Sequence, residues 1–189
     1  MKGSVSEFIK DLVINEGFAE CAFASAEKTF YEDAFKSWID SNKYGEMEWL
    51  ARQVDKRLNP TILLEGASSV ICVLERYHKG ESDPDINCHE GKIARYARGV
   101  DYHKLMKKRL YRVSDELKRN FPNHQFKVCV DTAPVLEREY ASRSGLGAVG
   151  KNTLLIEPSI GSWSFLGEII TTLKIETEKP IHFNPCSNC

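Results

Sequence analysis

The chain carries two cysteines at the spacing of metal ligands, Cys186 and Cys189, in a C-x-x-C motif. Thiolates at this spacing are typical of half a zinc site, of a redox dithiol, or of the first two ligands of a cubane iron–sulfur cluster. No partner pair of zinc ligands is evident. Because the chain stops at the second cysteine of such a motif, we expect it to be a truncated form, and the motif by itself leaves the three chemistries open.

A carboxylate at the end of a predicted strand is the second candidate for chemistry. Residues 126–131 predict a strand, and Asp131 ends it, directly before Thr-Ala-Pro. A side chain at the end of a strand projects toward the cavity that a sheet lines. The other interpretation is structural, because Asp131 could cap a helix that begins near Pro134. In that case any acid must be sought elsewhere, with His103 or a bound water as the next candidates.

The glycine-rich segment 145–152 satisfies G-x-G-x-x-G and comes one residue short of a phosphate-binding loop. Such a cradle requires a strand before the loop and a helix after it, so that the helix N-terminus faces the phosphate. Here a charged helix is predicted before the loop and a strand after it, and Asn152 replaces the hydroxyl that would hold magnesium. The glycines therefore indicate a tight helix-to-strand turn, or the close approach of backbone to a large ligand.

The other cysteines favour a reduced protein with a packed core. Cys72 and Cys129 lie in short β-branched runs, and Cys21 lies beside Ala and Phe, so we expect buried thiols at all three positions. Cys88 and His89 form a lone pair with too few ligands for a metal site. A chain of 189 residues is long enough to build a core without a disulfide framework.

Strand and helix signals alternate along the chain. This alternation predicts an α/β (α+β) layered domain with a mixed sheet flanked by helices. We expect helices at 4–17, 30–41, 45–52, 101–120 and 135–143, and strands at 69–74, 126–131, 153–156 and 165–175.

Composition excludes several classes of protein. A hydrophobic fraction of 42% and a net charge of −1 argue against collagen-like, coiled-coil and wholly disordered chains. No apolar run reaches the roughly 18 to 20 residues of a membrane span, and the N-terminus lacks the apolar region of a signal peptide. We therefore expect a cytoplasmic protein with no membrane partner.

One stretch is strongly basic although the whole chain is nearly neutral. Residues 92–119 contain ten Lys or Arg against three Asp or Glu, a local net charge of +7. Two interpretations remain open at this point: a solvated face of the long helix, or a surface for an anionic partner such as an RNA backbone.

Several stretches together resemble the epoxyqueuosine reductase family, whose members use cobalamin and iron–sulfur clusters in the last step of queuosine synthesis on tRNA. The matching pieces occur in the family's order and extend over nearly the whole chain. They are GEMEWL at 45–50, KRLNP at 56–60, IARYARGVDYH at 93–103, VDTAPVLE at 130–137, SGLGAVGKNT at 144–153 and GSWSFLGEI at 161–169.

The resemblance implies two domains. Residues 1–175 would form a nitroreductase-like cobalamin-binding catalytic domain, and residues 176–189 would begin a ferredoxin-like module with two 4Fe-4S clusters. Cys186 and Cys189 would be the first two ligands of one cluster. The chain lacks the other cluster cysteines, so we expect it to bind cobalamin but to be inactive on its own. We also expect a monomer that takes electrons from an external donor.

The resemblance also implies the site residues. It places the corrin against the segments around Arg57, Ala94 and Asp131, and it makes Asp131 the acid that faces the cobalt. Ala94 falls where some family members carry a cysteine, which would leave that corrin face open. Apolar walls and backbone hydrogen bonds would come from Leu155, Leu166 and Ile169. Without the family, Arg57 is equally a surface cation, and the last three residues are ordinary strand core.

The implied reaction removes the epoxide oxygen of epoxyqueuosine as water and yields queuosine. The implied partner is a tRNA anticodon stem-loop that carries epoxyqueuosine. Two alternatives remain from the sequence: a corrinoid-binding module without turnover, and a related corrinoid and iron–sulfur reductase that acts on another substrate.

Overall fold

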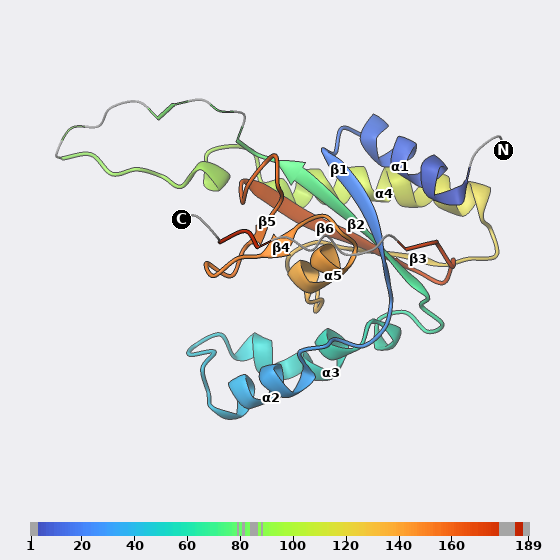
Figure 1. Ribbon diagram of the computed structural model, residues 1–189, viewed down its shortest axis with the longest axis horizontal. Helices are drawn as coiled ribbons and strands as arrows, with labels where there is room; N and C mark the ends of the chain where they lie inside the picture. Colours follow the sequence, from blue (N-terminus) through green and yellow to red (C-terminus); the bar gives the residue numbers. More distant parts are fainter. Residues whose placement is uncertain are drawn as a thin grey trace.

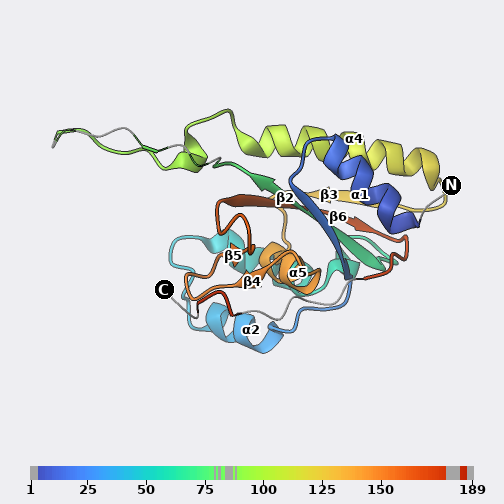
Figure 2. The same ribbon diagram turned by 45° about the horizontal axis from the view of Figure 1, so that its top comes forward.

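The protein is a three-layer structure in which helices cover both faces of a small sheet (Figures 1 and 2). The computed structural model describes residues 4–78, 80, 82–83, 87, 89–177 and 184–186. Among these residues, no helix is long and apolar enough to cross a membrane.

The central sheet has four strands in the order β1-β2-β6-β3. They are β1 (Glu20–Ser25), β2 (Ser69–Arg76), β6 (Ser164–Thr171) and β3 (Phe126–Cys129). Every pair is antiparallel, so the predicted mixed sheet is wrong. The alternation of helices and strands along the chain does not determine strand direction, and here the connections bring each neighbour back in the opposite sense. The sequence pattern also missed β1, although four of its six residues are buried.

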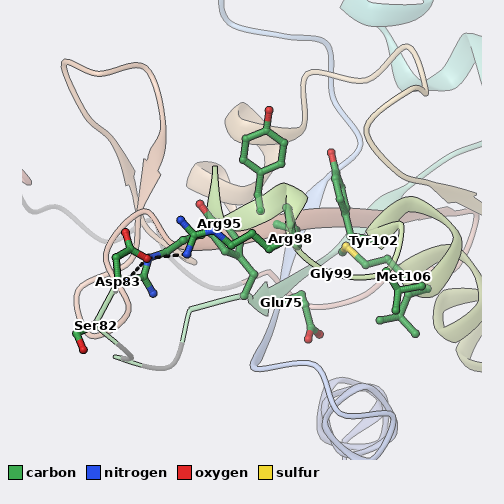
Figure 3. Close-up of a pocket in the computed structure, with 13 residues that line it drawn as sticks. Glu75, Ser82, Asp83, Arg95, Arg98, Gly99, Tyr102 and Met106 are labelled. Carbon is green, nitrogen blue, oxygen red and sulfur yellow. Dashed lines mark hydrogen bonds and ion pairs between the residues drawn. The ribbon is translucent and has the colours of Figure 1, made fainter. Parts of the chain in front are cut away.

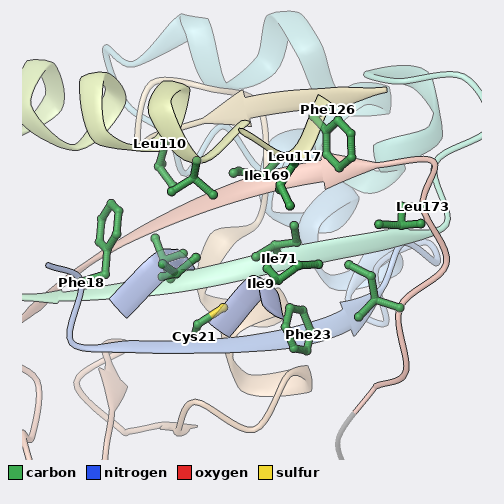
Figure 4. Close-up of a cluster of buried hydrophobic side chains, with 14 of the residues drawn as sticks. Ile9, Phe18, Cys21, Phe23, Ile71, Leu110, Leu117, Phe126, Ile169 and Leu173 are labelled. Atoms are coloured by element: carbon green, nitrogen blue, oxygen red, sulfur yellow. The ribbon is translucent and has the colours of Figure 1, made fainter. Parts of the chain in front are cut away.

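One face of the sheet is covered by α1 (Val5–Asn15) and α4 (Tyr102–Asn120) (Figures 2 and 4). A capping box begins α1, because the Ser4 side chain accepts from the backbone of Glu7 while the Glu7 side chain accepts from the backbone of Ser4. The apolar stripe of α4 packs on the sheet through fully buried side chains, namely Met106, Leu110, Val113 and Leu117.

The opposite face is covered by α5 (Glu137–Arg143) and by the hairpin of β4 (Ala148–Val149) and β5 (Leu155–Ile156) (Figure 2). The glycine segment makes the predicted helix-to-strand turn, and Gly145 ends α5 with a φ of 88°. A Cβ at Gly147 would stand 2.5 Å from the carbonyl oxygen of Ile156. The approach of backbone to backbone thus explains this glycine without a ligand.

The segment between β1 and β2 forms a helical layer beyond α5 (Figure 1). It contains α2 (Glu32–Asp40) and α3 (Val54–Leu58), with the short 3-10 turns η1 (Glu48–Gln53) and η2 (Pro60–Ile62). Thr29 donates to the Glu139 carboxylate, and the Tyr140 hydroxyl donates to the Glu27 carbonyl at 2.8 Å. These bonds connect the segment to α5. The helix predicted at 45–52 is the 3-10 turn η1.

The predicted buried thiols are confirmed. Cys21, Cys72 and Cys129 are reduced thiols buried in the sheet. Cys88 lies outside the described residues. Three predicted strands are shorter than expected, since β3 ends at Cys129, β5 begins only at Leu155 and β6 ends at Thr171.

Candidate active site

Asp131 lies two residues beyond the end of β3 in a left-handed backbone conformation, with a φ of 41°. Asp and Asn adopt this conformation more readily than other side chains, but it is still uncommon and marks positions under local constraint. The cap interpretation is wrong, because α5 begins only at Glu137, after Leu136, and has no side-chain cap. The Asp131 carboxylate is therefore available for other contacts.

A histidine from the first turn of α4 contacts this carboxylate. Nε2 of His103 lies 2.6 Å from Oδ2 of Asp131, and Nδ1 lies 2.9 Å from Oδ1 of Asp101, the residue that caps α4. Both ring nitrogens face carboxylate oxygens, an arrangement that suits the doubly protonated imidazolium. Burial acts to lower the pKa of His103, but the hydrogen bonds to Asp131 and Asp101 outweigh it and raise the pKa above its usual value.

A second carboxylate lies beside Asp131 at the start of α5. Burial, and then the charge of Asp131, raise the pKa of Glu137 to about 7. Glu137 is thus partly protonated near neutral pH. A carboxyl group in that state can both accept and donate a proton, which is the property required of a general acid.

Aromatic rings border the contact between Asp131 and His103. The ring of Tyr102 stacks on Phe165 with centroids 3.8 Å apart and planes inclined by 3°, and it also stacks on His103. Burial and the charge of Asp131 raise the pKa of Tyr102 to about 12, so its phenol stays protonated. The stack fixes the start of α4, and with it the imidazole, against β6.

Asp131 borders two cavities. One, of about 370 Å³, is lined by Tyr77, Tyr96, Tyr102, Leu155 and Leu166, among others. The other, of about 620 Å³, is mostly apolar and is lined by α2, η1 and α5, with Trp38, Trp49 and Arg57 in its wall.

A third cavity, of about 460 Å³, shares Tyr77, Tyr96, Tyr102 and Phe165 with the first and continues toward η3 (Arg95–Ala97). Its far wall is polar. Figure 3 shows Arg95 and Arg98 converging on Asp83, with nitrogen–oxygen distances of 2.9 and 2.6 Å. Aromatic faces beside guanidinium groups form a surface suited to a flat, hydrogen-bonding ligand.

Arg57 is buried in the wall of the 620 Å³ cavity. Its guanidinium lies 5.3 Å from the centroid of the Trp49 ring, and its buried Nε has no hydrogen-bond partner among the described residues. Burial lowers its pKa from the usual value. A buried donor without a partner is costly, so this position suits a ligand that supplies a polar acceptor.

The structure brings some of the predicted site residues together. Asp131, Leu155 and Leu166 line one cavity, and Arg57 lines the next, which Asp131 also borders. Ala94 is exposed and directly precedes η3, whose Arg95 and Tyr96 line the third cavity.

Ile169 does not lie at the candidate site. Its side chain is fully buried in the core on the α4 face of the sheet, away from α5, and lines none of the three cavities. The predicted apolar wall from its side chain is therefore not formed here.

The thiol of Cys186 accepts a hydrogen bond from the backbone N–H of Lys151, in the glycine turn, at 3.3 Å. Cys189 lies outside the described residues. Within the described part of the chain, no three His, Cys, Asp or Glu side chains converge as a metal site.

Sequence reasoning missed two carboxylates. Glu137 could have been suspected from its position six residues after Asp131, across a turn that contains proline. Glu168 is an acid in the middle of an apolar strand, and it is fully buried. Burial, followed by the charges of Glu137 and Asp131, raises the pKa of Glu168 well above its usual range.

In the basic stretch, residues 92–119, fewer cations are available to a partner than the net charge of +7 suggests. Most of its cations form ion pairs, including Arg109 with Glu75, Arg112 with Glu16 and Arg119 with Glu116. Lys107 and Lys108 are exposed and have no ion pair within the described part of the chain. Much of the stretch is thus a solvated helix face, with a few cations left for a partner.

Comparisons with known proteins show which sequences and folds this chain resembles. Residues 57–132 match the family model described as "Epoxyqueuosine reductase QueG, DUF1730". An epoxyqueuosine reductase of Xanthomonas campestris is 37% identical over 187 residues, which cover 96% of this chain and 53% of that protein.

Two solved structures share the fold. The epoxyqueuosine reductase of Streptococcus thermophilus superposes with a TM-score of 0.88 at 27% identity, covering 98% of this chain and 50% of that one. An epoxyqueuosine reductase solved with an epoxyqueuosine-modified tRNA-Tyr stem loop superposes with a TM-score of 0.84 at 26% identity. The match covers 97% of this chain and 49% of that one. The chain spans about half the length of these relatives, and over nearly its whole length it is similar to epoxyqueuosine reductases in sequence and in fold.

Proposed function

We propose that this chain is the cobalamin-binding catalytic part of an epoxyqueuosine reductase, formed by residues 1–175, and that residues 176–189 begin a ferredoxin-like module. The observation that carries the proposal is the position of Asp131 between two cavities, where it contacts His103 and adjoins Glu137. An acid at the meeting point of two cavities can serve a cofactor on one side and a substrate on the other.

The residues present fit cobalamin. The unpartnered Nε of Arg57 would donate to a polar group of the cofactor, and Leu155 and Leu166 would pack against the corrin. Ala94, beside η3, would leave one corrin face open. Bound cobalamin would supply the two-electron chemistry, a role that side chains cannot perform.

The protein's own residues would handle the protons. Conversion of the epoxide to an alkene and water consumes two electrons and two protons. Asp131 would pass to the departing oxygen a proton that it takes from the His103 imidazolium, and Glu137, whose pKa is raised to about 7, would hold a second proton near neutral pH. His103, bonded on both nitrogens, would hold the Asp131 carboxylate in place.

Cys186 and Cys189 would be the first two ligands of a 4Fe-4S cluster fed by an external electron donor. The hydrogen bond from Lys151 to Cys186 supports this assignment, because it connects the cluster end of the chain to the turn that precedes β5, which holds Leu155.

The proposed substrate is epoxyqueuosine in a tRNA anticodon stem-loop. The cavity lined by Tyr77, Tyr96 and Tyr102 offers aromatic faces on which a flipped base can stack. Lys107 and Lys108 on α4 are free to meet phosphates.

The test of this proposal begins with the cofactor. The chain is mixed with cob(II)alamin, and absorption and electron paramagnetic resonance spectra are recorded; we expect a shifted cobalamin signal. Arg57→Ala should weaken that shift, whereas Arg52→Ala, an exposed cation on the preceding turn, should not. An unshifted cobalamin spectrum would contradict the assignment, and flavin binding instead would indicate a simple nitroreductase.

Turnover is tested in a form of the protein that carries the iron–sulfur module, with an epoxyqueuosine-containing stem-loop and a chemical reductant. Queuosine formation supports the proposed activity. Cobalamin binding without turnover of this or any other epoxide would indicate a corrinoid-binding module.

A further inference from the structure

Glu168 occupies the centre of the sheet on the face that carries the candidate site. In the β-sheet register it stands opposite Cys72 on β2 and Cys129 on β3, whose side chains belong to the core beneath α5. Cross-strand partners project to the same face, so the Glu168 side chain points toward α5. That helix begins with Glu137.

This side chain is unusual because no cation and no hydrogen-bond partner balances it within the part of the chain that the structure describes. Its exposure is 0%, and neither carboxyl oxygen has a hydrogen-bond partner among the described residues. The titratable groups that face it are Glu137, Asp131, Cys72 and Cys129, all of them acids. A carboxylate would be destabilised here by desolvation and by like charges, so the side chain is a neutral carboxylic acid.

A buried neutral acid without a partner lowers the stability of the fold, so its presence here points to a functional role. A buried polar group without a partner loses its hydrogen bonds to water and gains none in return. A glutamine or an apolar residue of similar size would avoid the charge problem entirely. Instead, β6 carries a protonated carboxyl group beneath Asp131 and Glu137, the two acids that border the cavities.

We propose that Glu168 is a proton reserve for Asp131 and Glu137. This inference rests on the proposed function, in which each turnover consumes two protons. After Asp131 has given its proton to the departing oxygen, the O–H bond of Glu168 breaks and its proton passes to the Asp131–Glu137 pair, which donates again. No electron moves in this transfer. The second proton goes to the resulting hydroxyl group as it leaves as water, and the hydroxide that would otherwise leave is a far stronger base than any carboxylate, so the relay runs downhill. Glu168 regains its proton from solvent through the same carboxyls once the product has left.

The first experiment needs no substrate. Glutamate labelled with carbon-13 at the side-chain carboxyl is incorporated into the chain, and the carboxyl signals are followed by NMR as the pH is raised. We expect one signal to remain that of a neutral acid above neutral pH, and to be missing in Glu168→Gln. A Glu168 signal that reports a carboxylate at neutral pH would overturn the proposal.

The second experiment measures single-turnover queuosine formation against pH in the form that carries the iron–sulfur module. Glu168→Gln keeps the size and neutrality of the side chain but has no acidic proton. We expect about a tenfold loss of rate above neutral pH, which is less than a directly acting general acid provides, and a smaller loss in acid, where solvent protons reload Asp131. Glu168→Asp, which keeps an acidic proton, should recover part of the rate.

A matched control separates this role from mere structure. Ser114 carries another buried oxygen without a partner, in the core on the opposite face of the sheet. Ser114→Ala should leave the pH profile unchanged. If the rate of Glu168→Gln depends on pH as the wild-type rate does, the proton-reserve role of Glu168 is overturned and the proposed function is not. If the wild type shows no turnover, the proposed function is overturned, and the proton-reserve role with it.

Discussion

Nε2 of His103 and Oδ2 of Asp131 lie 2.6 Å apart, although the two residues are separated by 28 positions in the chain. The contact joins the first turn of α4 to the loop that follows β3. Because Asp101 holds the other ring nitrogen, the imidazole cannot rotate without breaking a second bond. The Asp131 side chain is thereby directed to the boundary of the two cavities.

The first prediction concerns Asp131→Asn. Asparagine tolerates the left-handed backbone and fills the same space, but it cannot donate a carboxyl proton. We expect queuosine formation to fall by at least about a hundredfold, the lower end of the range for general acid catalysis. Cobalamin binding, measured from the absorption spectrum, should be unchanged. Turnover near the wild-type rate with the cofactor in place would show that the acid lies elsewhere.

The second prediction concerns the titration of His103. Its pKa is raised in the folded state, so its contacts stabilise the protein below the pKa of the unfolded chain, about 6.5, and this stabilisation is lost as pH rises through the folded pKa. The difference in unfolding free energy between the wild type and His103→Gln should therefore shrink with rising pH. Proton NMR should give a His103 pKa above that of an exposed histidine, and Asp131→Asn should lower it.

The third prediction concerns Glu137, whose pKa is raised to about 7. Between the unfolded pKa of about 4.3 and that value, the folded state binds more protons than the unfolded state, so this group makes stability fall as pH rises. Glu137→Gln should flatten that part of the curve of unfolding free energy against pH. Urea denaturation at several pH values measures it, and a slope equal to that of the wild type would contradict the burial of this carboxyl.

The fourth prediction concerns the glycine turn. In Gly147→Ala the new methyl group would meet the Ile156 carbonyl at 2.5 Å, and since the obstacle is backbone, the hairpin must shift. We expect a loss of about 1–3 kcal/mol in unfolding free energy, the usual cost of overpacking. Gly99→Ala is the matched control, because nothing lies within 4 Å of a Cβ there. Equal effects at the two sites would refute the close approach.

The fifth prediction concerns RNA. Replacing Lys104, Lys107 and Lys108 by alanine should weaken binding of the stem-loop and reduce the slope of log affinity against log salt by roughly one unit per lost phosphate contact. Lys107 and Lys108 should contribute more than Lys104, which already lies 3.8 Å from Asp101. Filter binding at several salt concentrations measures this slope. An unchanged slope would leave α4 as a solvated face.

The sequence by itself determined the elements whose signals are local. The capping box at Ser4 and the apolar stripe of α4 predicted two helices nearly to the residue, because caps and helical periodicity act over one or two turns. The continuous apolar run of β2 and the buried cysteines were also predictable from the sequence, and the ordered motifs pointed to the same family as the comparisons.

Only the tertiary structure decided how these elements meet. Strand order and direction depend on pairings between distant segments, such as β2 with β6, so the alternating pattern led to a mixed sheet where the structure has an antiparallel one. The tertiary structure also decided the arrangement of the candidate site. His103, Asp131 and Glu168 come from a helix, a loop and a strand, and nothing in their local sequence indicates that folding will bring them together. The raised pKa values of His103 and Glu168 arise from hydrogen bonds, burial and neighbouring charges, which are properties of the packed fold and not of any single segment.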